Sequence, residues 1–584
     1  MCGIAGSVGT VDTSIAATMV AALHHRGPDH NGIAAAGPVI LGSARLSIVD
    51  PLGGNQPIYN EDRSLCLVFN GEIYNHLELR SKLLSLGHKF STNSDTEVII
   101  HLYEEYGERC VEFLRGMFSF AITDGRKLFL ARDRVGIKPL YYIQLRGPNL
   151  FLFSSEIKSL LATPIVPAKL DDIAVTDWAV IGHSVGNRTM LDGIRLLMPG
   201  ETLTLDAADP MQELRPSKYF SFDYRRDESM TMETAEELML ATLTESIDLH
   251  ARTTDGNLGI VLSGGLDSTL LALIADSTKQ AQLRTYTVAD HWQHPDVGQA
   301  RFVADIIKSN HRTLVIDYND YLNEIPQFIA VEETPSDLTD IPHYVMNREI
   351  GKDTKVCLSG EGADEIFGGY QEFVDRWHKA AGIRERIRLA GGAGMRLSNE
   401  AAAYVDPIIS ASSYEKYLDT LFKYSCADQL DRAHLHRVDK FGMAFSLEIR
   451  VPFLDNKVME LGTSMPIRHL VNSELGIRKH VLRRILVKKF GAKMLDIALR
   501  EKLTFPSAGD RFVATLGDLC KTYLPPDFAQ THPLGMFTSN VVKLVCFDLF
   551  VEIFIKNRGK ASAITSFSGF LESRYKARRE LHSA

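Results

Sequence analysis

The apolar positions divide the chain into a first part that predicts strands and a second part in which strands and helices alternate. In the first part, short apolar runs typical of buried strands accompany one helical pattern at Glu97–Tyr106. The predicted strands are Leu65–Asn70, Phe118–Thr123, Leu128–Ala131 and Leu150–Ser154. Residues 206–232 are polar and charged, contain Pro210 and Pro216 and show little periodicity, so we expect a linker there.

After a predicted helix near Thr234–Leu249, the second part repeats strand and helix. The further predicted strands are Gly259–Leu262, Leu283–Val288, Thr313–Ile316 and Val356–Leu358, and the helices between them are Thr269–Ala275 and Phe302–Ser309. This alternation predicts a parallel, doubly wound α/β sheet with its ligand at the carboxyl ends of the strands. We expect domains at residues 2–205 and 233–555, with a basic tail at 556–584.

The stretch Ser263-Gly264-Gly265-Leu266-Asp267-Ser268 lies between the first of these strands and its helix. Free backbone N–H groups and a helix N-terminus favour a phosphate there, the two serine hydroxyls add donors, and the Asp267 carboxylate could hold Mg²⁺. The spacing matches neither a Walker loop nor a dinucleotide fingerprint. Taken alone, the stretch also fits an ordinary glycine turn before a helix.

Composition narrows the class of protein. A chain of 584 residues with 45 % apolar and 23 % charged residues is typical of a globular protein with two domains. The net charge of −9 argues against nucleic acid as a partner. The apolar run Leu544–Ile555 is too short to span a membrane, no secretory signal precedes the first domain, and we interpret the run as a buried amphipathic helix. Seven scattered cysteines without a C-x-x-C pair fit a reducing cytosol and predict no structural zinc.

The N-terminus offers a second candidate site. Removal of Met1 would leave Cys2 with a thiol beside its own α-amino group, a nucleophile with its base. Cysteine in second place also occurs by accident. Asn70-Gly71 is typical of a hairpin turn, or of an oxyanion hole for an amide-cleaving thiolate. Arg45 and Asp95 could clamp an amino acid, although a surface salt bridge is the usual role of such a pair.

Six sequence blocks together resemble the glutaminase domain of class II glutamine amidotransferases. They are M-C-G-I at 1–4, H-H-R-G-P-D at 24–29, R-L-S-I-V-D at 45–50, F-N-G-E-I-Y-N at 69–75, S-D-T-E at 94–97 and R-D-R-V-G-I-K-P-L-Y-Y at 132–142. The glycine stretch resembles the pyrophosphate loop of ATP pyrophosphatases. The two halves in this order, over residues 1 to about 505, resemble the glutamine-hydrolysing asparagine synthetases.

The resemblance implies a four-layer αββα sandwich of the N-terminal-nucleophile type for the first domain. It implies that Cys2 attacks the glutamine amide while Asn70 and the Gly71 N–H hold the oxyanion. The glutamine pocket is then lined by Arg45, Leu46, Ile48, Val49, Asn70, Gly71, Glu72 and Asp95.

For the second domain the resemblance implies an ATP site with Mg²⁺. The implied ATP-binding residues are Leu262, Ser263, Gly264, Gly265, Asp267, Ser268, Val288, Ser359 and Gly360. Crowded carboxylates after the strand Val356–Leu358 need a metal or a proton, which makes Asp267 and Asp364 the expected magnesium ligands. Glu361 would assist acyl-adenylate formation and amidation, and Lys502 would stabilise the leaving pyrophosphate. A solvated acidic loop is the alternative for Glu361 and Glu365.

The predicted reaction is therefore glutamine-dependent, ATP-driven amidation of a carboxylate, with aspartate as the expected acceptor. Leu338 falls where some family members carry an arginine, and Phe505-Pro506-Ser507-Ala508 replaces a glycine-containing stretch, so another carboxylic acid stays open as acceptor. A non-catalytic relative is the other alternative. Leu447–Asp455 also matches the family and predicts a helix end with a proline turn. The basic tail predicts a solvated end or a docking segment, and the oligomeric state stays open, with a homodimer as one option.

Overall fold

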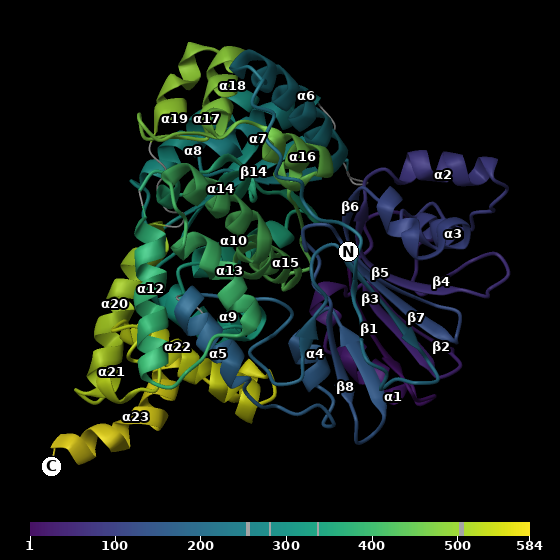
Figure 1. Cartoon of the computed structure of the whole chain (residues 1–584), viewed down its shortest axis with the longest axis horizontal. Helices are drawn as coiled ribbons and strands as arrows, with labels where there is room; N and C mark the ends of the chain where they lie inside the picture. Colours follow the sequence, from purple (N-terminus) through teal and green to yellow (C-terminus); the bar gives the residue numbers. More distant parts are fainter. Residues whose placement is uncertain (253–256, 279–281, 336–337, 376, 501–506, 584) are drawn as a thin grey trace.

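The computed structural model describes the chain except residues 253–256, 279–281, 336–337, 376, 501–506 and 584 (Figure 1). Its first part contains two six-stranded antiparallel sheets. The first sheet has the order β10 (Arg195–Leu196), β8 (Tyr141–Leu145), β9 (Leu150–Ser154), β1 (Cys2–Val8), β3 (Val39–Arg45) and β2 (His30–Ala36). The second has the order β12 (Ser217–Lys218), β11 (Glu201–Asp206), β7 (Lys127–Arg132), β6 (Gly116–Thr123), β5 (Cys66–Ile73) and β4 (Ile58–Tyr59).

The two sheets face each other across an apolar layer that includes Ile4, Leu41, Val68 and Leu130. Helices α1 (Ser14–Ala21) and α4 (Ile157–Leu161) cover the outside of the first sheet, and α2 (His76–Ser85) and α3 (Glu97–Tyr106) lie on the second. This is the four-layer αββα sandwich that the resemblance implied. The predicted strands and the helix at Glu97–Tyr106 are confirmed.

One local prediction in this part is wrong. Asn70 and Gly71 do not form a hairpin turn but lie inside β5, where they pair with Ser119 and Phe118 of β6. The apolar pattern of β5 continues through Ile73, and ladder hydrogen bonds to β6 outweigh the local turn preference of Asn-Gly. Strand β12 lies within the residues that we expected to be a linker.

The second part is built on a five-stranded parallel sheet (Figure 1). The strand order is β15 (Asn310–Val315), β14 (Gln282–Ala289), β13 (Asn257–Val261), β16 (Val356–Leu358) and β17 (Glu448–Arg450). Helices that flank the sheet are α6 (Met232–His250), α7 (Leu266–Thr278), α8 (Pro295–Ile307), α10 (Ile341–Gly351) and α18 (His480–Phe490). The order reverses between β13 and β16, the kind of switch point at which open α/β sheets bind ligands.

Strand β17 corrects the prediction for Leu447–Asp455. The segment is an edge strand that runs parallel to β16, and Pro452–Leu454 forms a 3₁₀ turn after it. A strand of three residues is too short for its apolar period to show in the sequence.

The C-terminal region is helical and packs around α9 (Tyr318–Glu332). Its long helices are α20 (Ser507–Tyr523), α22 (Val541–Val551) and α23 (Phe567–Ser583). Helix α22 buries Leu544, Val545 and Phe550, which confirms the predicted buried helix. The basic segment differs from a solvated end, because Phe567 and Tyr575 of α23 belong to the same core. Within the described part of the chain, no helix combines the length and the apolar character needed to cross a membrane.

Candidate active sites

Cys2 begins the central strand β1 and is 3 % exposed. Its backbone nitrogen donates to Asn70 Oδ1 at 3.1 Å, and its carbonyl accepts from Arg26 Nε at 3.2 Å. The side-chain amide of Gln56 lies 3.4 Å from the Cys2 Sγ. The thiol is therefore held in a buried, polar setting, and Gln56 is a neighbour that sequence analysis did not assign to the site.

Asn70 and Gly71 present donors next to Cys2. The Asn70 side chain is fully buried, and its Nδ2 has no hydrogen-bond partner among the residues that the structure describes. A buried amide donor without a partner is costly, which makes it a candidate for a ligand oxygen. Gly71 is required by close packing, since a Cβ there would lie 2.1 Å from the Met117 carbonyl oxygen. The Asn70 amide thus fits an oxyanion hole, and the glycine at position 71 is explained by packing against β6.

Arg45, which together with Asp95 was expected to clamp an amino-acid substrate, lies against the turn that follows β3. Its guanidinium donates to the carbonyls of Val49, Asp50 and Pro51 and to Asn55 Oδ1, at 2.8–3.2 Å. It therefore orders the turn that follows β3. Of the apolar residues implied for the glutamine pocket, Leu46 and Ile48 are buried and Val49 is half-buried, and all three pack toward the core of the second domain.

Two buried carboxylates complete the glutamine site. Asp95 Oδ2 accepts from the Ile73 N–H at 2.9 Å, and Glu72 lies 3.4 Å from Arg450 of the second domain. Burial raises the pKa of both carboxyl groups, and for Glu72 the nearby Arg450 opposes that shift. The glutamine site is therefore in direct contact with strand β17.

Buried ion pairs fix the two domains against each other. Arg26 pairs with Glu156 at 2.9 Å and with Asp439 at 2.8 Å, and Lys138 lies 3.1 Å from the same Asp439. Breaking a buried pair costs about 3–5 kcal/mol because it leaves an uncompensated charge. The relative position of the two sites is therefore strongly specified.

The turn after β13 is shaped by Gly264, which has φ +70°. A Cβ there would lie 2.5 Å from the Gln299 Cβ and 2.6 Å from the Ala300 nitrogen of α8. Ser263 Oγ lies 3.1 Å from Ser268 Oγ and accepts from the Gly265 N–H at 3.3 Å. The turn is thus a compact cradle at the N-terminus of α7, a suitable place for an anion.

A cavity of about 390 Å³ opens at this turn, at the switch point of the sheet. Eight of the predicted residues line it, namely Ser263, Gly265, Asp267, Ser268, Ser359, Gly360, Glu361 and Asp364. Three do not line it, because Leu262 and Val288 are buried in the apolar core and Gly264 packs on α8. Lys502 lies outside the described residues.

Lys479 is a residue of the cavity that sequence analysis missed. Its ammonium contacts Asp267 Oδ2 and lies 2.7 Å from Asp364 Oδ1. Burial would lower the pKa of Lys479, but the two carboxylates raise it, so the side chain is cationic. The backbone of Lys479 has φ +54° at the start of α18, which directs it toward the strand ends. The carboxylates of Asp267 and Asp364 therefore both contact the positive charge of Lys479.

The cavity lining also combines acids with cations. His434 lies 3.3 Å from Glu361 and 3.6 Å from Glu365. Burial would lower the pKa of His434, but the two glutamates raise it. Burial would raise the pKa of Glu361, yet the contact with His434 lowers it, so Glu361 is a carboxylate. Glu361 therefore lines the cavity and Glu365 is buried behind it, so the two do not form a solvated loop.

Arg437 adds a guanidinium to the cavity lining, and it pairs with Glu332 at 2.8 Å and with Asp340 at 2.7 Å. Leu338 does not line the cavity, because its side chain is fully buried and its carbonyl accepts from the Tyr321 hydroxyl. Leu338 therefore offers no side-chain group to a ligand in the cavity.

A buried thiol with an oxyanion donor and a phosphate cradle with paired carboxylates, held in one chain, define a two-site ATP-dependent amidotransferase. The model for a glutamine amidotransferase domain matches residues 1–220, and the asparagine synthase model matches residues 239–543.

Curated relatives match most of the chain. Asparagine synthetase [glutamine-hydrolyzing] 3 from Bacillus subtilis is 31 % identical over 87 % of this chain and 87 % of its own length. Asparagine synthetase [glutamine-hydrolyzing] 2 from rice (Oryza sativa subsp. japonica) is 34 % identical over 83 % of this chain and 73 % of its own length. The chain belongs to the family of glutamine-hydrolysing asparagine synthetases and is an ATP-binding ligase of this type.

Proposed function

We propose that this enzyme converts aspartate to asparagine through an acyl-adenylate, with ammonia from glutamine, and releases AMP and pyrophosphate. The observation that carries the proposal is the switch-point cavity. Its lining combines the phosphate cradle with Glu361, His434 and Arg437. Anion donors and a carboxylate-binding cation thus line one space, as a reaction between ATP and an amino acid requires.

In the first site, removal of Met1 makes the Cys2 nitrogen an α-amino group that accepts the thiol proton. The thiolate attacks the glutamine amide carbon, the proton goes to the departing ammonia, and water hydrolyses the thioester to glutamate. The partnerless Nδ2 of Asn70 supports a role in holding the oxyanion of this step. Gln56 is positioned to orient the sulfur.

In the second site, the substrate carboxylate attacks the α-phosphate of ATP, and pyrophosphate leaves with the electrons of the broken P–O bond. Lys479 supports this step, because its ammonium lies between Asp267 and Asp364 beside the cradle. Ammonia then attacks the acyl carbon, and AMP leaves.

The donor set also fits Mg²⁺. Asp267 and Asp364 offer hard carboxylate oxygens that meet around one positive charge, and Mg²⁺ in ATP sites is held by one or two carboxylates together with phosphate oxygens. When bound there, the ion would neutralise phosphate charge.

Ammonia must pass between the sites in the neutral form, because protonation removes its nucleophilic lone pair. The contact face supports such a passage. It joins Leu46 and Ile48 of the first domain to apolar residues of the second, such as Met443 and Val451.

The test supplies purified enzyme with glutamine, ATP, Mg²⁺ and aspartate, and follows asparagine, glutamate, AMP and pyrophosphate. We expect the four products in equal amounts, and asparagine also when ammonium replaces glutamine. Pyrophosphate and amide that form only with another carboxylic acid would overturn the aspartate assignment but keep the two-site reaction. Formation of ADP and phosphate would contradict the acyl-adenylate.

A further inference from the structure

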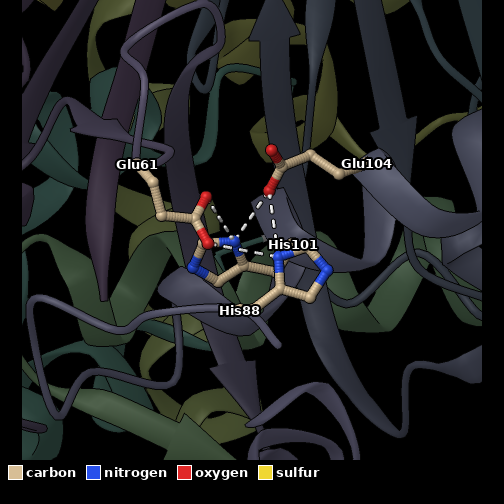
Figure 2. A group of neighbouring side chains, drawn as sticks. All are labelled: Glu61, His88, His101 and Glu104. Carbon is tan, nitrogen blue, oxygen red and sulfur yellow. Dashed lines mark hydrogen bonds and ion pairs between the residues drawn. The ribbon is translucent and has the colours of Figure 1, made fainter. Parts of the chain in front are cut away.

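A cluster of two histidines and two glutamates lies in the first domain, away from the residues assigned to the glutamine site (Figure 2). Glu61 follows β4, His88 lies in the connection between α2 and α3, and His101 and Glu104 lie one turn apart on α3. Each residue offers one ligand atom, and these four atoms lie within 4.8 Å of one another. Three separate segments thus converge on one point.

The spacing matches the coordination shell of a metal ion. His88 Nδ1 lies 3.2 Å from Glu61 Oε1 and 3.6 Å from Glu104 Oε2. His101 Nδ1 lies 2.7 Å from the same Glu104 oxygen and 3.5 Å from the second Glu61 oxygen, Oε2. Bonds of about 2.0–2.1 Å to Zn²⁺ place neighbouring ligands of a tetrahedron about 3.3 Å apart. The four separations therefore scatter around the value that zinc needs.

Hydrogen bonds alone cannot satisfy all four of these contacts. Each Nδ1 faces two carboxylates, but a ring nitrogen carries a single hydrogen, which points at one acceptor. Two of the four contacts would then remain without a hydrogen. A cation at the centre makes use of all four ligand atoms.

Outer contacts orient the ligands, as in established metal sites. His88 Nε2 lies 3.0 Å from Glu105, and His101 Nε2 lies 3.7 Å from Glu97. The second oxygen of Glu104 accepts from Asn60 Nδ2 at 2.8 Å, and Glu61 accepts from the Lys89 N–H at 2.9 Å. The ring of His101 packs against Phe90, with centroids 4.6 Å apart. The histidines are thus held with Nδ1 toward the centre.

We infer that Glu61, His88, His101 and Glu104 bind one Zn²⁺ ion. Two imidazoles and two carboxylates in tetrahedral reach suit zinc, whereas Mg²⁺ prefers six oxygen ligands. The cysteine pattern predicted no structural zinc, and this site uses no cysteine. The ion fastens the connection at residues 86–96 to α3 and to the turn after β4, and this connection also carries Asp95.

Metal binding is tested on the full-length protein after chelator treatment, with Mg²⁺ in excess to occupy the carboxylates of the ATP site. Competition between the protein and a chromophoric chelator for zinc should give one ion per chain with a Kd below about 1 μM. His101→Gln and His88→Gln should each weaken binding by at least about 100-fold, and Glu105→Gln by about 10-fold. His88 lies in a connection and not in the core, so it keeps the test valid if His101→Gln fails to fold.

Two control variants separate this site from other zinc binding. His24→Gln alters an exposed histidine of the same domain, and His434→Gln alters the other group that could hold a metal, which includes Glu361 and Glu365. Both should keep the tight zinc ion. Retention of zinc by His88→Gln and His101→Gln, or its loss in His434→Gln, would overturn the proposal. So would the absence of a stoichiometric ion.

A second measurement tests the fastening role. Lys89 is exposed within the connection and offers a trypsin site. Zinc should slow cleavage after Lys89 by about 10-fold in the wild type and should leave the rate unchanged in His88→Gln. Equal cleavage rates with and without zinc in the wild type would contradict the structural role.

Discussion

In the glutamine-hydrolysing half, Cys2, Asn70 and Gly71 lie within antiparallel strands, and neighbouring backbone fixes each of them. In the synthetase half, Ser263 and Glu361 lie on turns that follow parallel strands, and Asp364 lies in the short helix Ala363–Phe367, all around an open cavity. The first arrangement suits a small neutral amide that must be shielded from water. The second suits a large polyanion, which needs space and several charges. We therefore expect that a substitution can reduce the activity of one half and leave the activity of the other intact.

Among the variants, Cys2→Ala should produce the largest difference between glutamine-dependent and ammonium-dependent activity. The variant should lose at least about 10⁴-fold in glutamine hydrolysis, because no other thiol lies at the head of β1. Asparagine formation from ammonium should stay within about twofold of the wild type. Parallel assays with the two nitrogen sources measure the difference, and loss of both activities would show that the halves are not independent.

Lys479→Gln should produce the reverse pattern. Loss of the ammonium between Asp267 and Asp364 should reduce ATP-dependent synthesis by about 10²–10³-fold, because the cation no longer stabilises developing phosphate charge. Hydrolysis of glutamine to glutamate should continue. Lys457→Gln, which removes an exposed lysine of the same domain, is the matched control. Synthesis at the wild-type rate in Lys479→Gln would contradict the assigned role.

Gly264→Ala should act on the same half with a smaller effect. The added methyl group would collide with Gln299 and Ala300 and would strain a positive φ. A cost of about 1–3 kcal/mol corresponds to a rise in KM for ATP of about 5- to 150-fold. Gly298→Ala, where a Cβ meets nothing within 4 Å, is the control. Saturation with ATP at the wild-type concentration would rule out this account of the cradle.

The smallest effect concerns the contact between the halves. His250 of α6 packs against Tyr74 of the first domain with ring centroids 3.9 Å apart, and burial lowers its pKa to about 4. Since the unfolded chain takes up a proton at a higher pH than the folded one, His250 stabilises the fold above about pH 6.5. That contribution, about 3 kcal/mol, is lost as the pH falls toward 4.

Urea unfolding at about pH 7 and about pH 4.5 tests this effect. His250→Asn should reduce the difference in stability between the two pH values, whereas His24→Asn should leave it unchanged. An unaltered pH dependence in His250→Asn would show that the histidine does not carry the effect.

The sequence predicted what local patterns encode. The strand at β5, the helix α3 and the phosphate cradle each follow from a continuous stretch of residues. Lys479 was missed because it enters the cavity from the start of α18, more than 200 residues after Asp267. A single lysine also forms no recognisable sequence motif. The only local signal was the doublet Arg478-Lys479 before an amphipathic helix.

Contacts between distant parts of the chain also explain the other differences between the sequence predictions and the structure. Asn70-Gly71 favours a turn locally, but β6 extends beside it and keeps it in the sheet. Arg45 was expected to help clamp an amino acid, and its hydrogen bonds to the carbonyls of the following turn could not be predicted from the sequence. The zinc ligands were invisible for a similar reason, because three chain segments supply them and only His101 and Glu104 share a helix.

Strand β17 has a consequence for protein engineering. Its Arg450 side chain touches Glu72 in the glutamine site, while the Arg450 carbonyl accepts from the Ser359 N–H at the rim of the ATP cavity. A chimaera that exchanges whole domains between relatives at residues 206–232 would separate Glu72 from its natural arginine. Functional hybrids should therefore take residue 72 and residues 448–450 from the same parent.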